Sequence, residues 1–167
     1  NDDGYPDVYV TRAINDNDYF YENNEGNFTE ISSSTFFDSA GGDLNDSTQS
    51  NRVAVADFNN DSYLDIYVTR SVNNDDYLLK NNGDSTFTNY SSEYGVNDPD
   101  SGIGVAFNDF NQDGLPDIYC AKSLDDSLYE NLSENESNRY IIVEPLTDGD
   151  GDANEANLRV SVAYEHP

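Results

Sequence analysis

The sequence is poor in residues that several common functional sites require. Its single cysteine, Cys120, excludes a disulfide within the chain, and its single histidine, His166, disfavours a His-dependent nucleophilic triad or a zinc site. There is no methionine and no signal peptide, so we expect a processed or partial product. No apolar run approaches the length of a membrane span; residues 141–143 lie in one of the longest.

Basic residues are also scarce. Seven Lys and Arg stand against 34 Asp and Glu, which gives 167 residues a formal net charge of -27 at pH 7. This balance argues against nucleic acid or an anionic membrane as partner and favours cations. For acids outside ordered motifs, a solvated acidic surface remains the alternative. An aromatic content of 13% and regular apolar alternation argue against disorder.

Oxygen-bearing side chains, by contrast, are abundant and regularly spaced in residues 109–117, the third loop. Its candidate ligands are Asp109, Asn111, Asp113 and Asp117 at positions 1, 3, 5 and 9, and the backbone carbonyl of Leu115. Ca²⁺ takes about six to eight oxygen ligands, which alternate residues of a tight loop can supply. Gly114 at position 6 permits the sharp turn. The loop is not an EF-hand, because Cys120 stands at position 12 and the flanking residues alternate like strands.

The same pattern occurs twice more. The second loop, residues 57–65, offers Asp57, Asn59, Asp61 and Asp65, with Tyr63 in the place of Leu115. The first loop, residues 1–7, enters the pattern at position 3 and offers Asn1, Asp3, Tyr5 and Asp7. Asp3 and Asp61 lie 58 residues apart, and Asp61 and Asp113 lie 52 apart. The repetition predicts three Ca²⁺ sites, of which the second is weakened because Ser62 replaces glycine at a cost of about 1 kcal/mol.

Short alternating runs surround the loops and predict an all-β fold. In the first copy we expect strands at 8–12, 19–22 and 27–31, with a hairpin turn at 23–26. In the second copy we expect strands at 53–56, 66–70, 77–80 and 86–90. In the third copy we expect strands at 103–107 and 118–121 and a shortened strand at 124–131. Residues 32–51 and 91–101 read as polar connections. Cys120 occupies the place of Val10 and Val68, which indicates a buried strand residue.

Repeats of this length with four short antiparallel strands are typical of β-propeller blades. The number of copies does not close a ring, so we expect a segment of a larger propeller or edges covered by other chains. Residues 138–167 form a different, β-rich unit with runs at 139–146 and 157–164, whereas 1–137 form the blades. Between these runs, Asp148, Asp150 and Asp152 alternate like ligands, but Ala156 stands at the ninth position, so an acidic turn is favoured.

The repeats DFNNDSYLDIYVTR and DFNQDGLPDIYCAK, with the intervening DYLLKNNGDSTFT, resemble the FG-GAP/VCBS class of calcium-binding β-propeller repeats. That class occurs in integrin α-chain heads and many secreted bacterial proteins. The tail NRYIIVEPLTDGDGDANEANLRVSV is similar to the segment that follows such repeats in the cartilage acidic protein and UnbV/ASPIC group. The resemblance implies an extracellular or surface propeller whose calcium ions brace its loops, with a binding or structural role.

Six Asn-x-Ser/Thr sequons suggest glycosylation, although an Asn- and Ser-rich chain also produces them by composition. They lie at Asn27, Asn45, Asn60, Asn89, Asn131 and Asn135. Asn131 and Asn135 fall on what reads as a polar linker and are the best candidates, while Asn60 lies in a loop and should point outwards.

Three functions are compatible with these features. The first is a non-enzymatic, extracellular calcium-binding propeller segment that presents a surface to a protein or glycan ligand. The second is a subunit of a filament or homopolymer completed by neighbouring copies, because open sheet edges invite pairing. The third is a polysaccharide-acting enzyme using paired carboxylates. It is the weakest of the three, because the spaced acids are already assigned to metal.

Overall fold

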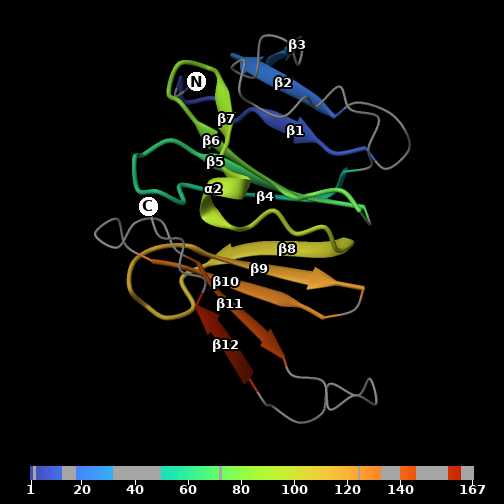
Figure 1. Cartoon of the computed structure of the whole chain (residues 1–167). Helices are drawn as coiled ribbons and strands as arrows, with labels where there is room; N and C mark the ends of the chain where they lie inside the picture. The colour runs from blue at the N-terminus through green and yellow to red at the C-terminus, as the bar shows by residue number, and fades with distance from the viewer. Residues whose placement is uncertain are drawn as a thin grey trace.

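A computed structural model gives the structure of the chain and describes residues 1, 3–12, 18–31, 50–71, 73–123, 125–132, 140–145 and 158–162. The described strands form three antiparallel sheets, which follow one another in chain order (Figure 1). The first sheet has the order β1-β2-β3, with β1 (Val8–Val10), β2 (Tyr19–Asn24) and β3 (Asn27–Ile31). The predicted all-β class is confirmed.

The second sheet has the predicted four-stranded antiparallel arrangement. Its order is β4-β5-β6-β7, with β4 (Ser50–Ala56), β5 (Asp65–Arg70), β6 (Tyr77–Asn81) and β7 (Phe87–Asn89). A one-turn helix, α2 (Ser91–Tyr94), follows β7 and ends at Gly95 with a φ of 68°. The sequence predicted only a polar connection here; the side-chain oxygen of Asn89 accepts the backbone N–H of Ser91 (2.9 Å) and so fixes the start of the turn.

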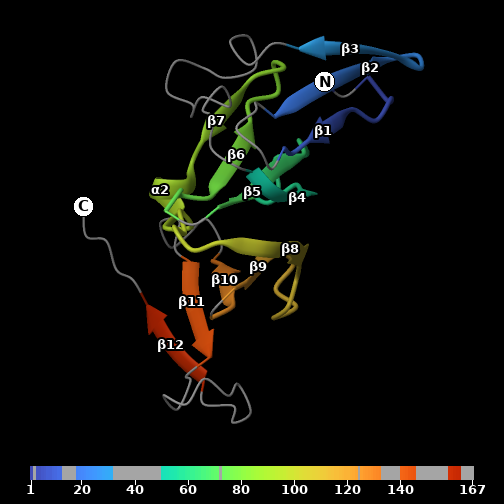
Figure 2. The same cartoon turned by 90° about the vertical axis from the view of Figure 1, so that its right-hand side faces the viewer.

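The third sheet contains five strands in the order β12-β11-β10-β9-β8. They are β8 (Gly102–Asn108), β9 (Asp117–Lys122), β10 (Ser127–Asn131), β11 (Tyr140–Pro145) and β12 (Leu158–Val162). β11 pairs with β10, so the strands of the tail continue this sheet (Figure 2). The predicted division between residues 137 and 138 lies outside the described residues and stays a prediction, as does the acidic turn at 148–155.

Strand β5 lies at the centre of the described core, and all six of its residues are buried. Because successive side chains of a strand point to opposite faces, each face of β5 contacts a different neighbouring sheet. Tyr67 joins a cluster with Phe58, Val96, Ile118 and Tyr129, whereas Ile66 and Val68 join one that includes Tyr9, Phe20 and Ile31. The second sheet is therefore covered on both faces, by the first sheet on one side and by the third on the other.

The second and third sheets approach each other closely at strand β8. A Cβ atom placed on Gly102 would lie 2.4 Å from the Cβ of Thr69 on β5, so only glycine fits there. The side-chain amide of Asn51 on β4 donates to the carbonyls of Gly102 (2.9 Å) and Arg70 (3.0 Å). Cys120 is fully buried on β9, as predicted, and burial raises the pKa of its thiol.

Candidate metal centres

The three loops occupy equivalent places in the three sheets. The second loop joins β4 to β5, the third joins β8 to β9, and the first leads directly into β1. Residues 57–64 and 109–116 and the described residues of the first loop contain no helix or strand, and position 9 of the second and third loops is the first residue of β5 and β9. Their shape is fixed by side-chain oxygens that accept backbone N–H groups of the same loop, which is how Asp and Asn stabilise tight turns.

In the third loop, Asp109 accepts two backbone N–H groups, from Asp113 to Oδ1 (3.0 Å) and from Gly114 to Oδ2 (2.9 Å). The side-chain oxygen of Asn111 accepts the same Asp113 N–H (3.0 Å), and Asp113 Oδ1 accepts the N–H of Leu115 (2.9 Å). The sequence places these residue types at alternate positions, and the structure brings them together inside one turn.

The second loop repeats this arrangement bond for bond. Asp57 accepts the N–H groups of Asp61 (3.0 Å) and Ser62 (2.8 Å), and Asn59 Oδ1 accepts that of Asp61 (3.1 Å). Asp61 Oδ1 accepts the N–H of Tyr63 (2.9 Å). In the first loop the corresponding bond runs from Tyr5 N–H to Asp3 (2.9 Å). The second and third loops therefore share one geometry, and the described residues of the first loop keep the contact between positions 5 and 7.

Position 6 has the left-handed backbone that the glycine pattern predicted. The φ angle is 93° at Gly114, 87° at Gly4 and 74° at Ser62, so the serine occupies a conformation that favours glycine. Position 4 also has a positive φ, 63° at both Asn60 and Gln112. The positive φ at position 4 was not predicted; Asn60 is the one sequence signal for it, because asparagine tolerates this region.

The aspartate at position 9 connects each loop to the hairpin that follows. Asp65 accepts the N–H groups of Phe58 (3.1 Å) and Asn81 (2.8 Å), and Asp117 accepts those of Phe110 (2.9 Å) and Asn131 (2.8 Å). In the first loop Asp7 accepts the N–H of Asn23 (2.8 Å). The aspartate at position 9 therefore holds the loop against the following hairpin and is also a candidate ligand. The spacing alone did not predict the first of these roles.

Burial, and after it the charges of neighbouring residues, shifts the pKa of three loop aspartates. Burial, together with the charges of Asp61 and Asp57, raises the pKa of Asp65 to about 7. Burial likewise raises the pKa of Asp117, with a contribution from Asp113 and Glu130. Burial would also raise the pKa of Asp61, but hydrogen bonds from Tyr63 N–H and Asn59 and the charge of Lys80 outweigh it and lower the pKa. A cation bound near Asp65 or Asp117 would relieve this repulsion.

The donor set of the loops fits a hard cation. It consists of carboxylates, an amide oxygen and a backbone carbonyl, and a carboxylate oxygen that accepts one N–H keeps a second lone pair. An ammonium group already lies beside the second loop, where Lys80 Nζ is 3.5 Å from Asp61 Oδ2. Within the described residues, however, no three His, Cys, Asp or Glu side chains are arranged as a metal site. Calcium coordination therefore stays a prediction.

One charged position beside the loops was missed by the sequence reasoning. Glu22 on β2, Lys80 on β6 and Glu130 on β10 each precede the asparagine that contacts position 9. The amide of Asn1 donates to Glu22 (2.6 Å), and that of Asn111 donates to Glu130 (2.7 Å). Aligning YFYEN, YLLKN and SLYEN would have identified the position.

A second repeated contact lies at the far end of the same strands and was also missed. The hydroxyl of Tyr67 donates to Asp76 (3.1 Å), and that of Tyr9 donates to Asp18 (2.9 Å). Asp76 also accepts the backbone N–H of Arg70 (2.7 Å). Burial raises the pKa of Asp76 to about 8, with a contribution from the charge of Asp98. Each of these aspartates therefore links a tyrosine of one strand to the start of the next strand.

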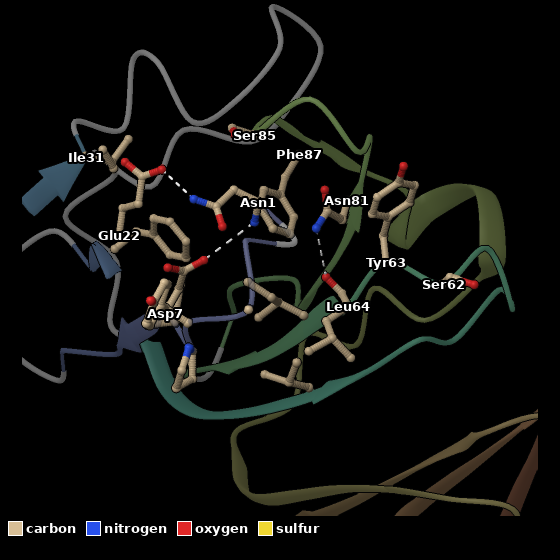
Figure 3. A pocket seen from close by; sticks show the side chains of 17 residues that line it. Asn1, Asp7, Glu22, Ile31, Ser62, Tyr63, Leu64, Asn81, Ser85 and Phe87 are labelled. Carbon is tan, nitrogen blue, oxygen red and sulfur yellow. Dashed lines mark hydrogen bonds and ion pairs between the residues drawn. The ribbon is translucent and has the colours of Figure 1, made fainter. Parts of the chain in front are cut away.

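A cavity of about 460 Å³ lies between the first and second sheets, beside the first loop (Figure 3). Its apolar lining includes Tyr9 and Phe20 from the first sheet and Ile66 and Phe87 from the second. Polar groups at its edge are already engaged: the Asn81 amide donates to the carbonyl of Leu64 (3.3 Å). The lining includes Asn1, Asp7 and Ser62, so the cavity overlaps the first and second loops.

The structure corrects one glycosylation prediction. Asn131 does not lie on a linker; it ends β10, is buried, and donates its amide to the carbonyls of Phe58 (2.6 Å) and Pro116 (3.2 Å). A glycan on this nitrogen is incompatible with the fold. Asn27 and Asn60 are exposed and Asn89 is partly so, and their glycosylation stays a prediction. Asn45 and Asn135 lie outside the described residues, as does His166.

Comparison with known proteins agrees with the repeat pattern. The family model described as FG-GAP-like repeat matches residues 1–68 and 57–120. Cartilage acidic protein 1 of Xenopus tropicalis is 40% identical over 76 residues, which is 45% of this chain and 12% of that protein. The chain thus spans a small part of this relative. The part of the chain that the structure describes has no helix with the length and hydropathy of a membrane span.

Proposed function

Because the chain belongs to the FG-GAP-like repeat family, we propose that it is an extracellular, non-enzymatic calcium-binding segment of a β-propeller. The ions hold the loops between strands rigid, and the braced sheets present a surface to a protein or glycan. The extracellular setting is supported by the resemblance to FG-GAP/VCBS repeats and by the name of the Xenopus relative, which ties that protein to cartilage.

The observation that carries this proposal is the recurrence of one hydrogen-bonded loop with one donor set. Asp57, Asn59 and Asp61 in the second loop make the same backbone contacts as Asp109, Asn111 and Asp113 in the third. A turn needs only one such contact to close. Gathering several carboxylates into it raises their mutual repulsion, which a divalent cation offsets.

The proposal is tested by thermal melting of the full chain in calcium and in excess chelator. A site saturated about 100-fold above its dissociation constant contributes about 2.7 kcal/mol, so chelation should lower the melting temperature by several degrees and calcium should restore it. Glu93→Gln removes an exposed charge on α2 that belongs to none of the three loops, and should leave this response unchanged. An identical melting temperature in calcium and chelator would contradict the proposal.

A second candidate function, assembly with further copies, is favoured by the outer face of the third sheet. Phe58 and Tyr67 on the second sheet are 1% and 0% exposed because the third sheet covers them. Their equivalents on the third sheet, Phe110 and Tyr119, are 45% and 37% exposed and stack edge to face with ring centroids 6.5 Å apart. We propose that a sheet of a second copy packs on this face.

Sedimentation velocity in calcium tests this assembly. The wild type should sediment as a concentration-dependent oligomer, and Phe110→Ser should shift it to monomer. Ile103→Ser removes another exposed apolar side chain, 54% exposed on strand β8, and serves as the matched control. A wild type that remains monomeric at all concentrations would rule out self-assembly through this face.

A further inference from the structure

The three loops differ in the charge that the neighbouring strand places beside them. Glu22 and Glu130 each accept a hydrogen bond from the position-3 asparagine of their own loop, Asn1 (2.6 Å) and Asn111 (2.7 Å). In the second loop the same strand position is Lys80, whose ammonium lies 3.5 Å from Asp61. The position therefore contacts the side chain of a candidate ligand residue in each loop, but with opposite signs of charge.

Lys80 is held in place and does not extend freely into water. Its side chain is 29% exposed and that of Asp61 is 30% exposed. Its ammonium also lies 5.9 Å from the centroid of the Tyr90 ring, within reach of a cation–π contact. The second loop thus carries a built-in positive charge at the carboxylate that should bind metal.

Ligand charge is one of the main determinants of calcium affinity in oxygen-ligand loops. The third loop combines Asp109, Asp113 and Asp117 with the carboxylate of Glu130, whose amide partner Asn111 also donates to Asp113 (2.8 Å). The second loop has three loop carboxylates and the opposing ammonium of Lys80. A divalent cation entering the second loop meets repulsion from that ammonium, whereas in the third loop it meets a further attraction.

Taking calcium binding as proposed above, we infer that the residue at the position of Glu22, Lys80 and Glu130 sets how strongly each loop needs calcium. The third loop is a tight site that depends on the ion. The second loop is a weak site that its own lysine keeps in shape when calcium is scarce. The segment therefore remains partly braced at low calcium and becomes fully braced only at higher calcium.

A loop-resolved calcium titration of the full chain tests the inference. The backbone amides of Ser62 and Gly114 donate to Asp57 and Asp109, so their NMR signals report on the second and third loops separately. In the wild type, Gly114 should reach half-saturation at a lower calcium concentration than Ser62. Lys80→Glu should tighten the second loop by about 10- to 100-fold, and Glu130→Lys should weaken the third by a similar factor. The uncharged Lys80→Gln should fall between the wild type and Lys80→Glu.

The controls separate failure of this inference from failure of calcium binding. Glu93→Gln should move neither titration, because Glu93 lies on α2 outside the loops. If both amides respond to calcium but Lys80→Gln and Lys80→Glu leave the Ser62 midpoint unchanged, the inference is overturned and calcium binding stands. If neither amide responds up to millimolar calcium, both proposals are overturned.

Discussion

The second and third loops differ in what surrounds them and hardly at all in their own geometry. Both hold positions 1, 3 and 5 by the same backbone bonds, and both anchor position 9 to the next hairpin. They differ at position 6, Ser62 against Gly114, and on the adjacent strand, Lys80 against Glu130. The comparison teaches that the Asp and Asn spacing encodes the shape of the loop, and we propose that residues outside that spacing tune its demand for a cation.

The largest expected effect comes from substituting the aspartate at position 9, which anchors each loop to the hairpin that follows. Asp65→Ala and Asp117→Ala each leave two backbone N–H groups without their acceptor at a buried position. Each substitution should lower the free energy of unfolding by about 2–4 kcal/mol, measured by urea denaturation. The Asn variants keep one acceptor oxygen and should lose less. A large loss of stability in one alanine variant with none in the other would show that position 9 does not play the same role in the two loops.

The strands and the backbone conformation of the loops are largely predictable from sequence, because they depend on residues that are close together in the chain. The apolar alternation placed every described strand within a few residues, and the glycine pattern predicted the positive φ at Gly114 and the strain at Ser62. Both depend on residues close together in the chain, whose conformational preferences act directly on the backbone.

The features that the sequence did not reveal depend on contacts between distant residues. Glu130 reaches Asn111 across 19 positions because β10 lies beside β9, and Asn131 is buried because the second sheet packs over it through Phe58. The pairing of β11 with β10 likewise follows from tertiary packing and not from the local pattern of either strand. Register and packing had to be known before these residues could be placed.

The next prediction concerns how the free energy of unfolding of the metal-free chain depends on pH. In the folded state the pKa of Asp65 is about 7 and that of Asp76 about 8, both above the usual value near 4 in an unfolded chain. Their contribution to stability is therefore complete below about pH 4 and is lost as pH rises through 7 to 8. In chelator, the free energy of unfolding should fall by several kcal/mol between pH 5 and pH 8, at about 1.4 kcal/mol per pH unit for each carboxyl that stays protonated in the folded state.

Calcium and a single variant check the origin of this fall. Asp65→Asn should remove the Asp65 part of this fall and leave the part due to Asp76. Saturating calcium should also remove the Asp65 part, because the bound ion favours the charged carboxylate. A metal-free stability that rises from pH 5 to pH 8 would contradict the repulsion described for the loops.

Exchanging the residues at position 6 should have a smaller effect. Ser62→Gly relieves a left-handed serine, and Gly114→Ser introduces one. We expect about 1 kcal/mol of stabilisation in the first case and a similar loss in the second, both measured by thermal melting. Equal and opposite shifts would show that the two loops share one backbone; shifts of the same sign would show that they do not.

The smallest effect concerns the strand charges in the absence of metal. In chelator, Lys80→Gln removes an attraction to Asp61 and should destabilise the chain, whereas Glu130→Gln removes a repulsion and should stabilise it. Each shift should be about 0.5 kcal/mol, the size typical of partly exposed charges. Differential scanning calorimetry at low salt measures both, with Glu22→Gln expected to follow Glu130→Gln. Stability changes of the same sign for Lys80→Gln and Glu130→Gln would contradict the proposed difference in charge between the two loops.

Hydrogen–deuterium exchange with and without calcium tests the central claim most directly. Peptides covering residues 57–65 and 109–117 report on the two loops in one sample of the full chain. The account predicts that chelation increases exchange in both loops, and more strongly in 109–117, where no lysine replaces the ion. Exchange that is identical in calcium and chelator at both loops would contradict the claim that these loops bind calcium.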